Sequence, residues 1–246
     1  MRLQTEGIVL SATRYGDNRL IVNMYTRQEG RRAFLVRLAA KSRGRFRSSY
    51  FFPLTQLELV FDSLHSGDEL CYLTEARLAY VYRDMYADIR KSSVACFLAE
   101  VMGRCISQAE GAPWFYDSLA AALRGFDARR QGVSDFHLFF LLALAGFLGV
   151  YPSERKRAED AYFDLREGAF VPEPPSHRDY LDACQADDLA MLMDARRQSA
   201  DGFPEANLFP SGRRQALLHA LADYCRIHAG LDQGFRTLDV LEDVFR

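Results

Sequence analysis

The sequence lacks the cysteine pattern of a disulfide-rich domain. Its five cysteines are odd in number and widely separated, and none forms a Cys-x-x-Cys pair. Such a set argues against a disulfide framework and fits a reducing compartment. Long hydrophobic runs are missing too, since the longest uncharged apolar run, residues 138–151, is too short to span a bilayer and is typical of a buried core helix. No signal peptide is visible, so we expect a cytoplasmic protein.

Motifs of known catalytic chemistry are also absent. The chain has no Gly-x-x-x-x-Gly-Lys-Ser/Thr loop, no Gly-x-Gly-x-x-Gly, no His-Glu-x-x-His and no Gly-x-Ser-x-Gly. The histidines lie far apart, and acidic pairs such as Asp187 and Asp188 have no supporting motif. We therefore expect a protein that is not an enzyme and that has no cofactor. A metal-dependent nuclease remains an alternative, which cleavage of labelled DNA with Mg²⁺ or Mn²⁺ would reveal.

The charges are unevenly distributed, although the formal net charge is only −2. Residues 1–50 contain eleven Lys or Arg against three acidic residues, a formal charge of +8, so the remaining 196 residues carry −10. A basic first fifth followed by an acidic remainder indicates a nucleic-acid-binding module attached to something else.

The most concentrated basic segment is KSRGRFRSS, residues 41–49. Lys41, Arg43, Arg45 and Arg47 occupy every second position there, with Phe46 among them. In an extended chain these four cations project to one side, and they repel each other by about 1 kcal/mol per close pair in water. The segment is either a solvated loop or a surface for a polyanion. Aromatic residues near it that could stack on bases are Phe46, Tyr15, Tyr50 and Phe51. For the last three, packing in the core or at the rim of the barrel described next is the alternative.

The pattern of apolar residues predicts strands first and helices later. Short strands are expected at 7–15, 18–26, 31–39, 54–62 and 69–82. Five strands without a helical period suggest a small closed or partly closed barrel. From about residue 84 the period becomes helical, with helices expected at 94–106, 114–126, 134–149, 179–199 and 211–229. The third is apolar nearly all round and should lie at the centre of a bundle. A hairpin is expected at 161–172, around Gly168.

Several stretches resemble the RecO family of bacterial recombination mediators. They are TEGIVLSATRYGDNRLIVNMYTRQEGRRAFLVR, the later FFPLTQLELVF and ELCYLTEARL, and FLLALAGFLGVYPS and YFDLREGAF in the helical part. The resemblance covers most of the chain. It implies an α+β fold in which a five-stranded OB-fold barrel, residues 1–82, precedes a helical domain, residues 83–246, with the hairpin inserted.

The resemblance also implies a function. Family members bind single- and double-stranded DNA and anneal complementary strands. They associate with RecR and with single-strand binding protein so that RecA is loaded during recombinational repair, which would place this protein on the nucleoid. Basic residues of the family's barrel carry DNA and map here onto Arg31, Arg32, Arg37, Lys41, Arg43, Arg45 and Arg47. With Arg14 and Phe46 they form the predicted DNA surface. The alternative is a protein-interaction adaptor whose basic segment is incidental.

Two departures from the family pattern stand out. The family commonly has a Lys-Gly-Ala-Arg-like sequence after the third strand, where this chain has Arg37-Leu38-Ala39-Ala40-Lys41. Some relatives carry a four-cysteine zinc knuckle in the hairpin region, but residues 150–183 here contain no cysteine. Because tetrahedral zinc needs four Cys or His ligands, we expect no zinc. In its place we expect the hairpin to pack through Tyr162, Phe163 and Phe170.

The resemblance implies a second binding site, for the acidic, Phe-ended tail of single-strand binding protein. Such a tail needs an apolar pocket and a cation for its terminal carboxylate. The cluster Arg124, Arg129 and Arg130, at the end of the second helix, is the predicted partner-binding site. A solvated helix C-terminus with favourable dipole charges is the alternative.

Overall fold

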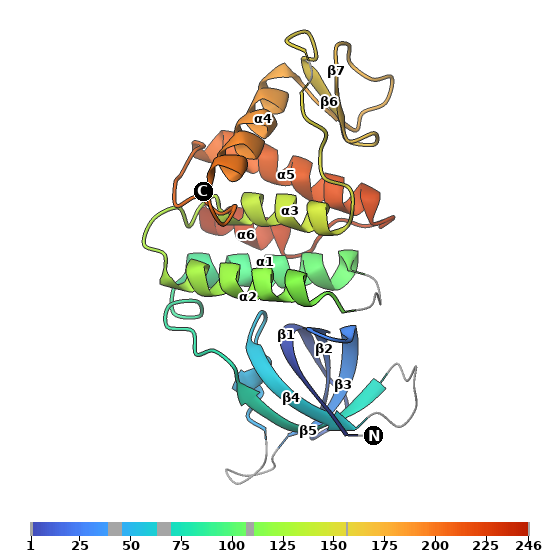
Figure 1. Ribbon diagram of the computed structural model, residues 1–246, viewed down its shortest axis with the longest axis vertical. Helices are drawn as coiled ribbons and strands as arrows, with labels where there is room; N and C mark the ends of the chain where they lie inside the picture. The colour runs from blue at the N-terminus through green and yellow to red at the C-terminus, as the bar shows by residue number, and fades with distance from the viewer. Residues whose placement is uncertain (1, 39–45, 63–69, 107–110, 156, 246) are drawn as a thin grey trace. The chain divides into compact units, whose positions relative to one another are not determined.

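The computed structural model describes residues 2–38, 46–62, 70–106, 111–155 and 157–245 (Figure 1). The predicted α+β fold is confirmed: a closed five-stranded barrel comes first, and helices with a small three-stranded sheet follow. The chain divides into two compact units, residues 1–87 with 102–127 and residues 88–101 with 128–246. The first unit therefore includes residues beyond the predicted barrel domain 1–82. No described helix is long and apolar enough to cross a membrane.

The barrel consists of five strands that overlap the five predicted ones, although the first begins at residue 2 and not 7, and the last ends at residue 78 and not 82. They are β1 (Arg2–Arg14), β2 (Arg19–Thr26), β3 (Gly30–Arg37), β4 (Gln56–Asp62) and β5 (Leu70–Leu78). Their order around the barrel is β1-β2-β3-β5-β4, and β4 closes the barrel by pairing with β1. All pairs are antiparallel except β3 with β5. This closed five-stranded barrel is the OB-fold that the resemblance implies.

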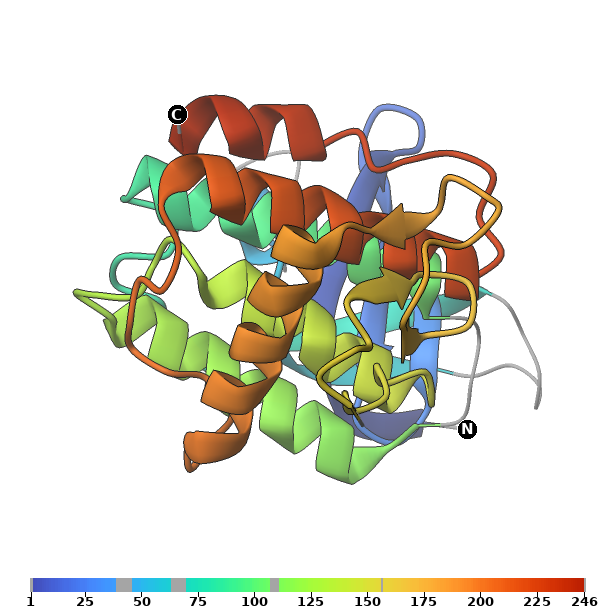
Figure 2. The same cartoon turned by 90° about the horizontal axis from the view of Figure 1, so that it is seen from above.

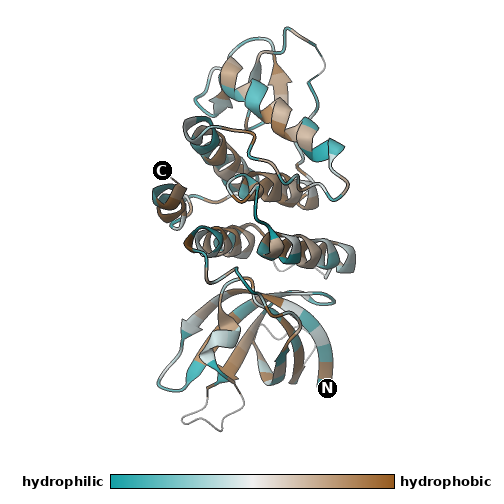
Figure 3. Ribbon diagram, turned by 90° about the vertical axis from the view of Figure 1, so that its left-hand side faces the viewer, coloured by the Kyte–Doolittle hydropathy of each residue, from teal (hydrophilic) through white to brown (hydrophobic). Residues whose placement is uncertain are grey.

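Alternating side chains fill the barrel. Along β2, Leu20, Val22 and Met24 are buried, with less buried residues between them. Figure 3 shows this alternation as bands of both colours along the strands. Phe34 and Phe61 meet edge to face in the core, with ring centroids 5.2 Å apart. Each such buried side chain contributes about 1.5–3 kcal/mol of hydrophobic stabilisation, so the alternating pattern fixes the register of the strands.

The segment between β3 and β4 contributes two phenylalanines to the barrel core. Phe46 is 4% exposed and Phe51, in the short 3-10 helix η1 (Ser48–Phe51), is also buried. Their ring centroids lie 6.2 Å apart, and both belong to the core cluster of the barrel. This corrects the expectation that Phe46 offers a stacking platform, because its ring is not accessible to a base. For Phe51 the alternative, packing in the barrel core, is confirmed. Tyr50 is half-buried against the same cluster, whereas Tyr15 is 53% exposed.

Helices α1 (Ile89–Cys105) and α2 (Pro113–Ala128) follow the barrel in the chain. The division between the two units falls within α1, and α2 lies in the first unit up to Asp127. Pro113 is the first residue of α2, one residue before the start of the predicted helix 114–126, and proline suits a first helical turn. Phe115 of α2 packs edge to face on Tyr25 of β2, with ring centroids 5.6 Å apart. Helix α2 therefore packs against the barrel inside the first unit.

The second unit is built around helix α3 (Phe136–Phe147). As predicted, α3 is apolar and buried nearly all round, and it packs against α4 (Ala183–Gln198) and α5 (Ser211–His228). Figure 2 shows α4 running across α5 at a steep angle. The predicted helices at 179–199 and 211–229 thus exist with shorter bounds. The final helix, α6 (Leu238–Phe245), was not predicted.

The predicted hairpin is confirmed as β6 (Tyr162–Asp164) and β7 (Ala169–Val171). A further short strand, β8 (Tyr180–Leu181), pairs with β6 and was not predicted. Phe163 and Phe170 pack with ring centroids 4.9 Å apart, and Tyr162 packs on Tyr180 at 6.1 Å. Aromatic packing therefore holds the hairpin together, as expected from the absence of cysteines.

Candidate nucleic-acid interface

The turn between β1 and β2 and the end of β3 form one exposed edge of the barrel. Gly16 has a positive φ of 71°, which glycine adopts without strain. The backbone N–H of Tyr15 donates to the carbonyl of Arg19 at 2.9 Å, and that of Leu38 donates to the carbonyl of Asn18 at 2.8 Å. These bonds fix the positions from which the side chains of residues 14–19 project into solvent.

Two arginines face each other at this edge. Arg19 of β2 and Arg37 of β3 are Cα partners in the antiparallel ladder, and both are exposed. The guanidinium of Arg19 lies over the ring of Tyr15, 5.6 Å from its centroid. Among the residues that the structure describes, no carboxylate forms an ion pair with either arginine. A hollow of about 510 Å³ is lined by Asp17, Asn18, Arg19, Arg37 and Leu38.

This arrangement suits a phosphate backbone. Like charges directly opposite each other on two strands destabilise the pair, and an anion placed between them reverses that effect. The neighbouring Tyr15 adds an exposed ring on which a base can stack. Arg14, also exposed, precedes it in the chain. We call Arg14, Tyr15, Arg19 and Arg37 the barrel-edge cluster.

Other predicted DNA-binding residues have different positions. Lys41, Arg43 and Arg45 lie outside the described residues. Arg47 is exposed and directly precedes η1, where its carbonyl accepts a hydrogen bond from the backbone N–H of Tyr50 at 3.1 Å. Of the predicted set, Arg14, Arg37 and Arg47 are therefore available at the described surface.

The side chains of Arg31 and Arg32 bind other groups of the protein. The Nη1 of Arg31 donates to the carbonyl oxygens of Gly103 and Ile106, at 2.6 and 2.9 Å, and so caps the C-terminal end of α1. The guanidinium of Arg32 pairs with the carboxylate of Glu29 at 2.9 Å. The structure corrects the prediction that Arg31 binds DNA, because its guanidinium binds the carbonyl groups at the end of α1. We leave both residues outside the candidate interface.

The predicted partner-binding arginines do not form one free cluster. Arg129 is only 4% exposed, and its guanidinium donates to the carbonyls of Phe203 and Pro204 and lies 5.2 Å from the ring centroid of Phe136. Burial lowers the pKa of this guanidinium. This corrects the prediction that Arg129 receives a peptide carboxylate, because it holds the second unit together. Arg130, next to it, is exposed.

Arg124 belongs to a network inside the first unit. Its Nε donates to Oε1 of the fully buried Gln56 at 3.0 Å, and its guanidinium lies 5.4 Å from the ring centroid of Tyr80. The side-chain amide of Gln56 in turn donates to the hydroxyl of Tyr82 at 2.8 Å and to the carbonyl of Ala120 at 3.1 Å. Arg124 thus ties α2 to β4 while part of its side chain remains exposed.

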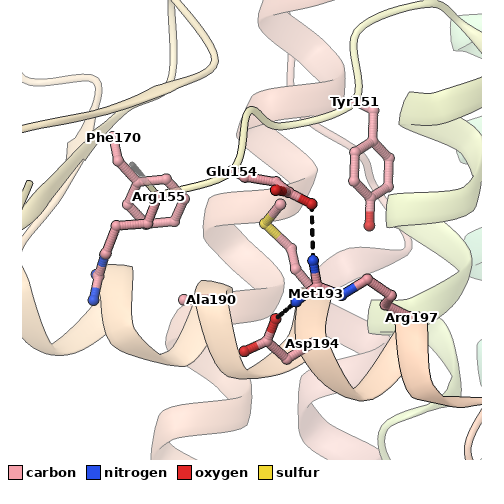
Figure 4. Close-up of a pocket in the computed structure, with 8 residues that line it drawn as sticks. All are labelled: Tyr151, Glu154, Arg155, Phe170, Ala190, Met193, Asp194 and Arg197. Atoms are coloured by element: carbon pink, nitrogen blue, oxygen red, sulfur yellow. Dashed lines mark hydrogen bonds and ion pairs between the residues drawn. The ribbon is translucent and has the colours of Figure 1, made fainter. Parts of the chain in front are cut away.

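The second unit has a cavity of about 490 Å³ between α4, β7 and the segment after α3 (Figure 4). Arg197 pairs there with Glu154 at 2.9 Å and with Asp194 at 2.6 Å. Arg155 lies over the ring of Phe170 and pairs with Asp187 at 2.7 Å. Both cations that line the cavity are thus already paired with carboxylates, which makes it a poor site for phosphate.

No group of three or more His, Cys, Asp or Glu side chains in the described part of the chain is placed to hold a metal ion. All five cysteines lie in the described residues and none of them forms a disulfide; Cys71, Cys105 and Cys225 are buried. In the hairpin region, Nε2 of His177 lies 3.2 Å from the carboxylate of Asp164, which also accepts the backbone N–H of Arg166.

Sequence reasoning missed Arg19 as a site residue. It counted Arg19 among the basic residues of the first fifth but not in the DNA surface. The signal was available in the sequence, because Arg19 begins one strand, Arg37 ends the next, and only residues 27–29 separate the two strands. Two strands joined by a short turn place such residues opposite each other.

Comparison with known proteins agrees with this fold. The family model described as "Recombination protein O N terminal" matches residues 1–82, and "Recombination protein O C terminal" matches residues 86–233. The chain is 32% identical over 246 residues to a DNA repair protein RecO of Phocaeicola vulgatus. Relatives with the same description from Bacteroides fragilis and Flavobacterium psychrophilum are 31% and 29% identical, and each alignment covers the full length of both chains. The chain therefore belongs to the RecO family of DNA repair proteins, which supports a role in recombinational repair.

Proposed function

We propose that this chain is a non-enzymatic mediator that binds single- and double-stranded DNA and anneals complementary single strands. The observation that carries the proposal is the exposed Arg19–Arg37 pair on an OB-fold barrel, where no described carboxylate neutralises either cation. The family membership and the names of the relatives support it.

Annealing by such a surface follows from electrostatics. Two complementary strands repel each other through their phosphates, and cations that neutralise some of these phosphates release counterions and lower that repulsion. Contacts to phosphates leave the base edges free to pair with the second strand. The protein then needs no covalent step and no cofactor.

We further propose that the chain acts with RecR to help load RecA onto DNA that is coated by single-strand binding protein. The acidic tail of that protein would need an accessible cation for its terminal carboxylate. Arg130 and the exposed part of Arg124 remain candidates for this role, whereas Arg129 is buried. The test is the affinity of Arg124→Ala and of Arg130→Ala for the tail peptide. If neither substitution changes that affinity, neither arginine binds the terminal carboxylate.

The test is annealing of two complementary fluorescent oligonucleotides in EDTA. We expect the wild type to accelerate annealing and Arg19→Ala/Arg37→Ala to be slower. Arg77→Ala is the matched control, because Arg77 is an exposed barrel arginine whose charge is already paired with Glu58 at 3.5 Å. Full annealing activity of the double variant would mean that DNA binds at a different surface of the protein. Absence of DNA binding by the wild type would favour the protein-interaction adaptor.

A further inference from the structure

Four aromatic rings of the first unit form a continuous row. Phe52 lies 5.6 Å from Tyr86, Tyr86 lies 5.7 Å from Tyr82, and Tyr82 lies 5.2 Å from Tyr80, measured between ring centroids. The guanidinium of Arg124 ends the row, over the ring of Tyr80. We call Phe52, Tyr86, Tyr82 and Tyr80 the aromatic ladder.

One end of the aromatic ladder is open to solvent. Phe52 is 49% exposed and Tyr86 is 39% exposed, whereas Tyr82 and Tyr80 are more buried. Phe46, six residues before Phe52, and Phe51, directly before it, are both buried in the barrel core. The same segment therefore turns two phenylalanines inward and presents the third at the surface.

The backbone beneath the exposed rings is held rigidly. The hydroxyl of Tyr86 donates to the carbonyl of Pro53 at 3.0 Å and lies 2.8 Å from the hydroxyl of Thr55. The hydroxyl of Tyr82 donates to the carbonyl of Leu54 at 3.0 Å. Leu54 has a φ of 64°, an uncommon conformation for a residue with a side chain, and it persists only where the surroundings hold it. The ring of Phe52 thus projects from a strained segment that two ladder tyrosines clamp.

The other side of the aromatic ladder is anchored as well. The carboxylate of Asp127, at the end of α2, accepts the backbone N–H groups of Arg83, Asp84 and Met85, at 2.9, 2.9 and 2.7 Å. These three residues connect Tyr82 to Tyr86. Both exposed rings are therefore pre-positioned, which lowers the entropy cost of binding a flat partner.

Two exposed arginines lie near the exposed rings in the chain. Arg47 is exposed five residues before Phe52, and η1 lies between them. Five Cα steps of 3.8 Å limit their separation to about 19 Å, which a few nucleotides can span. Arg83 is exposed within the segment that joins Tyr82 to Tyr86. Rings flanked by arginines fit a polymer that alternates flat π faces with phosphates.

We propose that Phe52 and Tyr86 form a stacking platform for bases of single-stranded DNA, beyond the phosphate contacts of the barrel-edge cluster. This inference rests on the proposed function, because it adds base contacts to the phosphate contacts proposed for the same barrel. Bases that stack on either ring would be held without regard to sequence, as an annealing protein requires.

The test compares a thymidine oligonucleotide with an abasic strand of the same length, each binding to the full-length protein in fluorescence anisotropy. We expect Phe52→Ala to weaken binding of the thymidine strand about fivefold or more and to leave abasic binding unchanged, because only the stacked base is lost. The salt slope should stay the same, since no phosphate contact is removed. Tyr86→Phe, which keeps the ring, should bind as the wild type does once its folding is verified.

Tyr72→Ala is the matched control, because Tyr72 is 50% exposed on β5 and lies outside the aromatic ladder. It should leave both affinities unchanged. If Phe52→Ala binds the thymidine strand as tightly as the wild type while salt-dependent binding persists, the stacking platform is wrong and the proposed function stands. The exposed rings of Phe52 and Tyr86 would then be assigned to the binding of a protein partner. Absence of salt-dependent binding in the wild type would overturn both.

Discussion

Arg19 and Arg37 occupy opposite positions on β2 and β3, so that two arginines share one cross-strand pair at an exposed edge of the barrel. Like charges in such a pair destabilise the strands by about 0.2–1 kcal/mol. The Tyr15 ring offsets part of this for Arg19, since a cation over an exposed ring gains about 0.5–1 kcal/mol. A bound phosphate would turn the remaining repulsion into attraction.

Replacing both arginines by alanine should therefore weaken single-stranded DNA binding and reduce its salt dependence. Each lost phosphate contact lowers the slope of log affinity against log salt by about 0.7, so Arg19→Ala/Arg37→Ala should flatten it by about 1.4. Anisotropy titrations across a salt series measure this. The free energy of unfolding should change by no more than about 0.5 kcal/mol, because both positions are exposed. A slope equal to that of the wild type would place the phosphates elsewhere.

Phe46 should prove to be a core residue in unfolding experiments. Phe46→Ala removes a ring that packs in the barrel core against Phe51, and such truncations cost about 3–5 kcal/mol. Tyr15→Ala, at an exposed ring, should cost less than about 0.5 kcal/mol yet weaken DNA binding. Denaturant unfolding together with anisotropy separates the two. A Phe46→Ala variant as stable as the wild type would contradict the burial of the Phe46 ring.

The contrast between these two aromatic residues shows what could be predicted from the sequence. The five strands were found because alternation of apolar residues reports directly on a half-buried sheet. The inward turn of Phe46 was not found, because its neighbours in the sequence are cations and its partner Phe51 is brought to it by η1. Local composition indicates exposure, but burial of a single ring depends on contacts that the pattern does not contain.

The arginines show the same limit for the candidate site. Charge counting found the basic first fifth of the chain, but it could not separate Arg37, which faces solvent, from Arg31, which binds carbonyls at the end of α1. Those carbonyls lie more than seventy residues away in the sequence. Every residue has a backbone carbonyl, so the residue types do not show which carbonyl accepts a hydrogen bond from an arginine. Only the structure distinguishes an arginine that binds the protein's own backbone from one whose charge is exposed to a ligand.

Arg129 should likewise behave as a structural residue. Arg129→Ala leaves the carbonyls of Phe203 and Pro204 without their donor and opens space beside Phe136, which should cost about 2–4 kcal/mol of unfolding free energy. Arg130→Ala should cost less than about 0.5 kcal/mol. Thermal unfolding of both variants checks this. At a temperature where both remain folded, Arg129→Ala should bind the tail peptide as the wild type does, and a selective loss of that binding would contradict the burial of Arg129.

His137 should make the second unit sensitive to acid. The side chain is buried in α3, and neither ring nitrogen has a hydrogen-bond partner. Burial, reinforced by the nearby positive charge of Arg214, lowers the pKa of His137 to about 3 from its ordinary value of 6.5. Between these two values the unfolded chain binds a proton that the folded chain excludes, so the free energy of unfolding must fall as the pH decreases through this range.

The expected loss is about 1.4 kcal/mol per pH unit below 6.5, or about 2 kcal/mol at pH 5. A His137→Leu variant lacks this term, and its advantage over the wild type should grow by that amount between pH 7 and pH 5. Denaturant unfolding at several pH values measures the difference. Between pH 7 and pH 8 the histidine is mostly neutral in both states, so the two proteins should keep a nearly constant difference there, which is the internal control. A difference that stays constant down to pH 5 would mean that His137 can accept a proton in the folded protein.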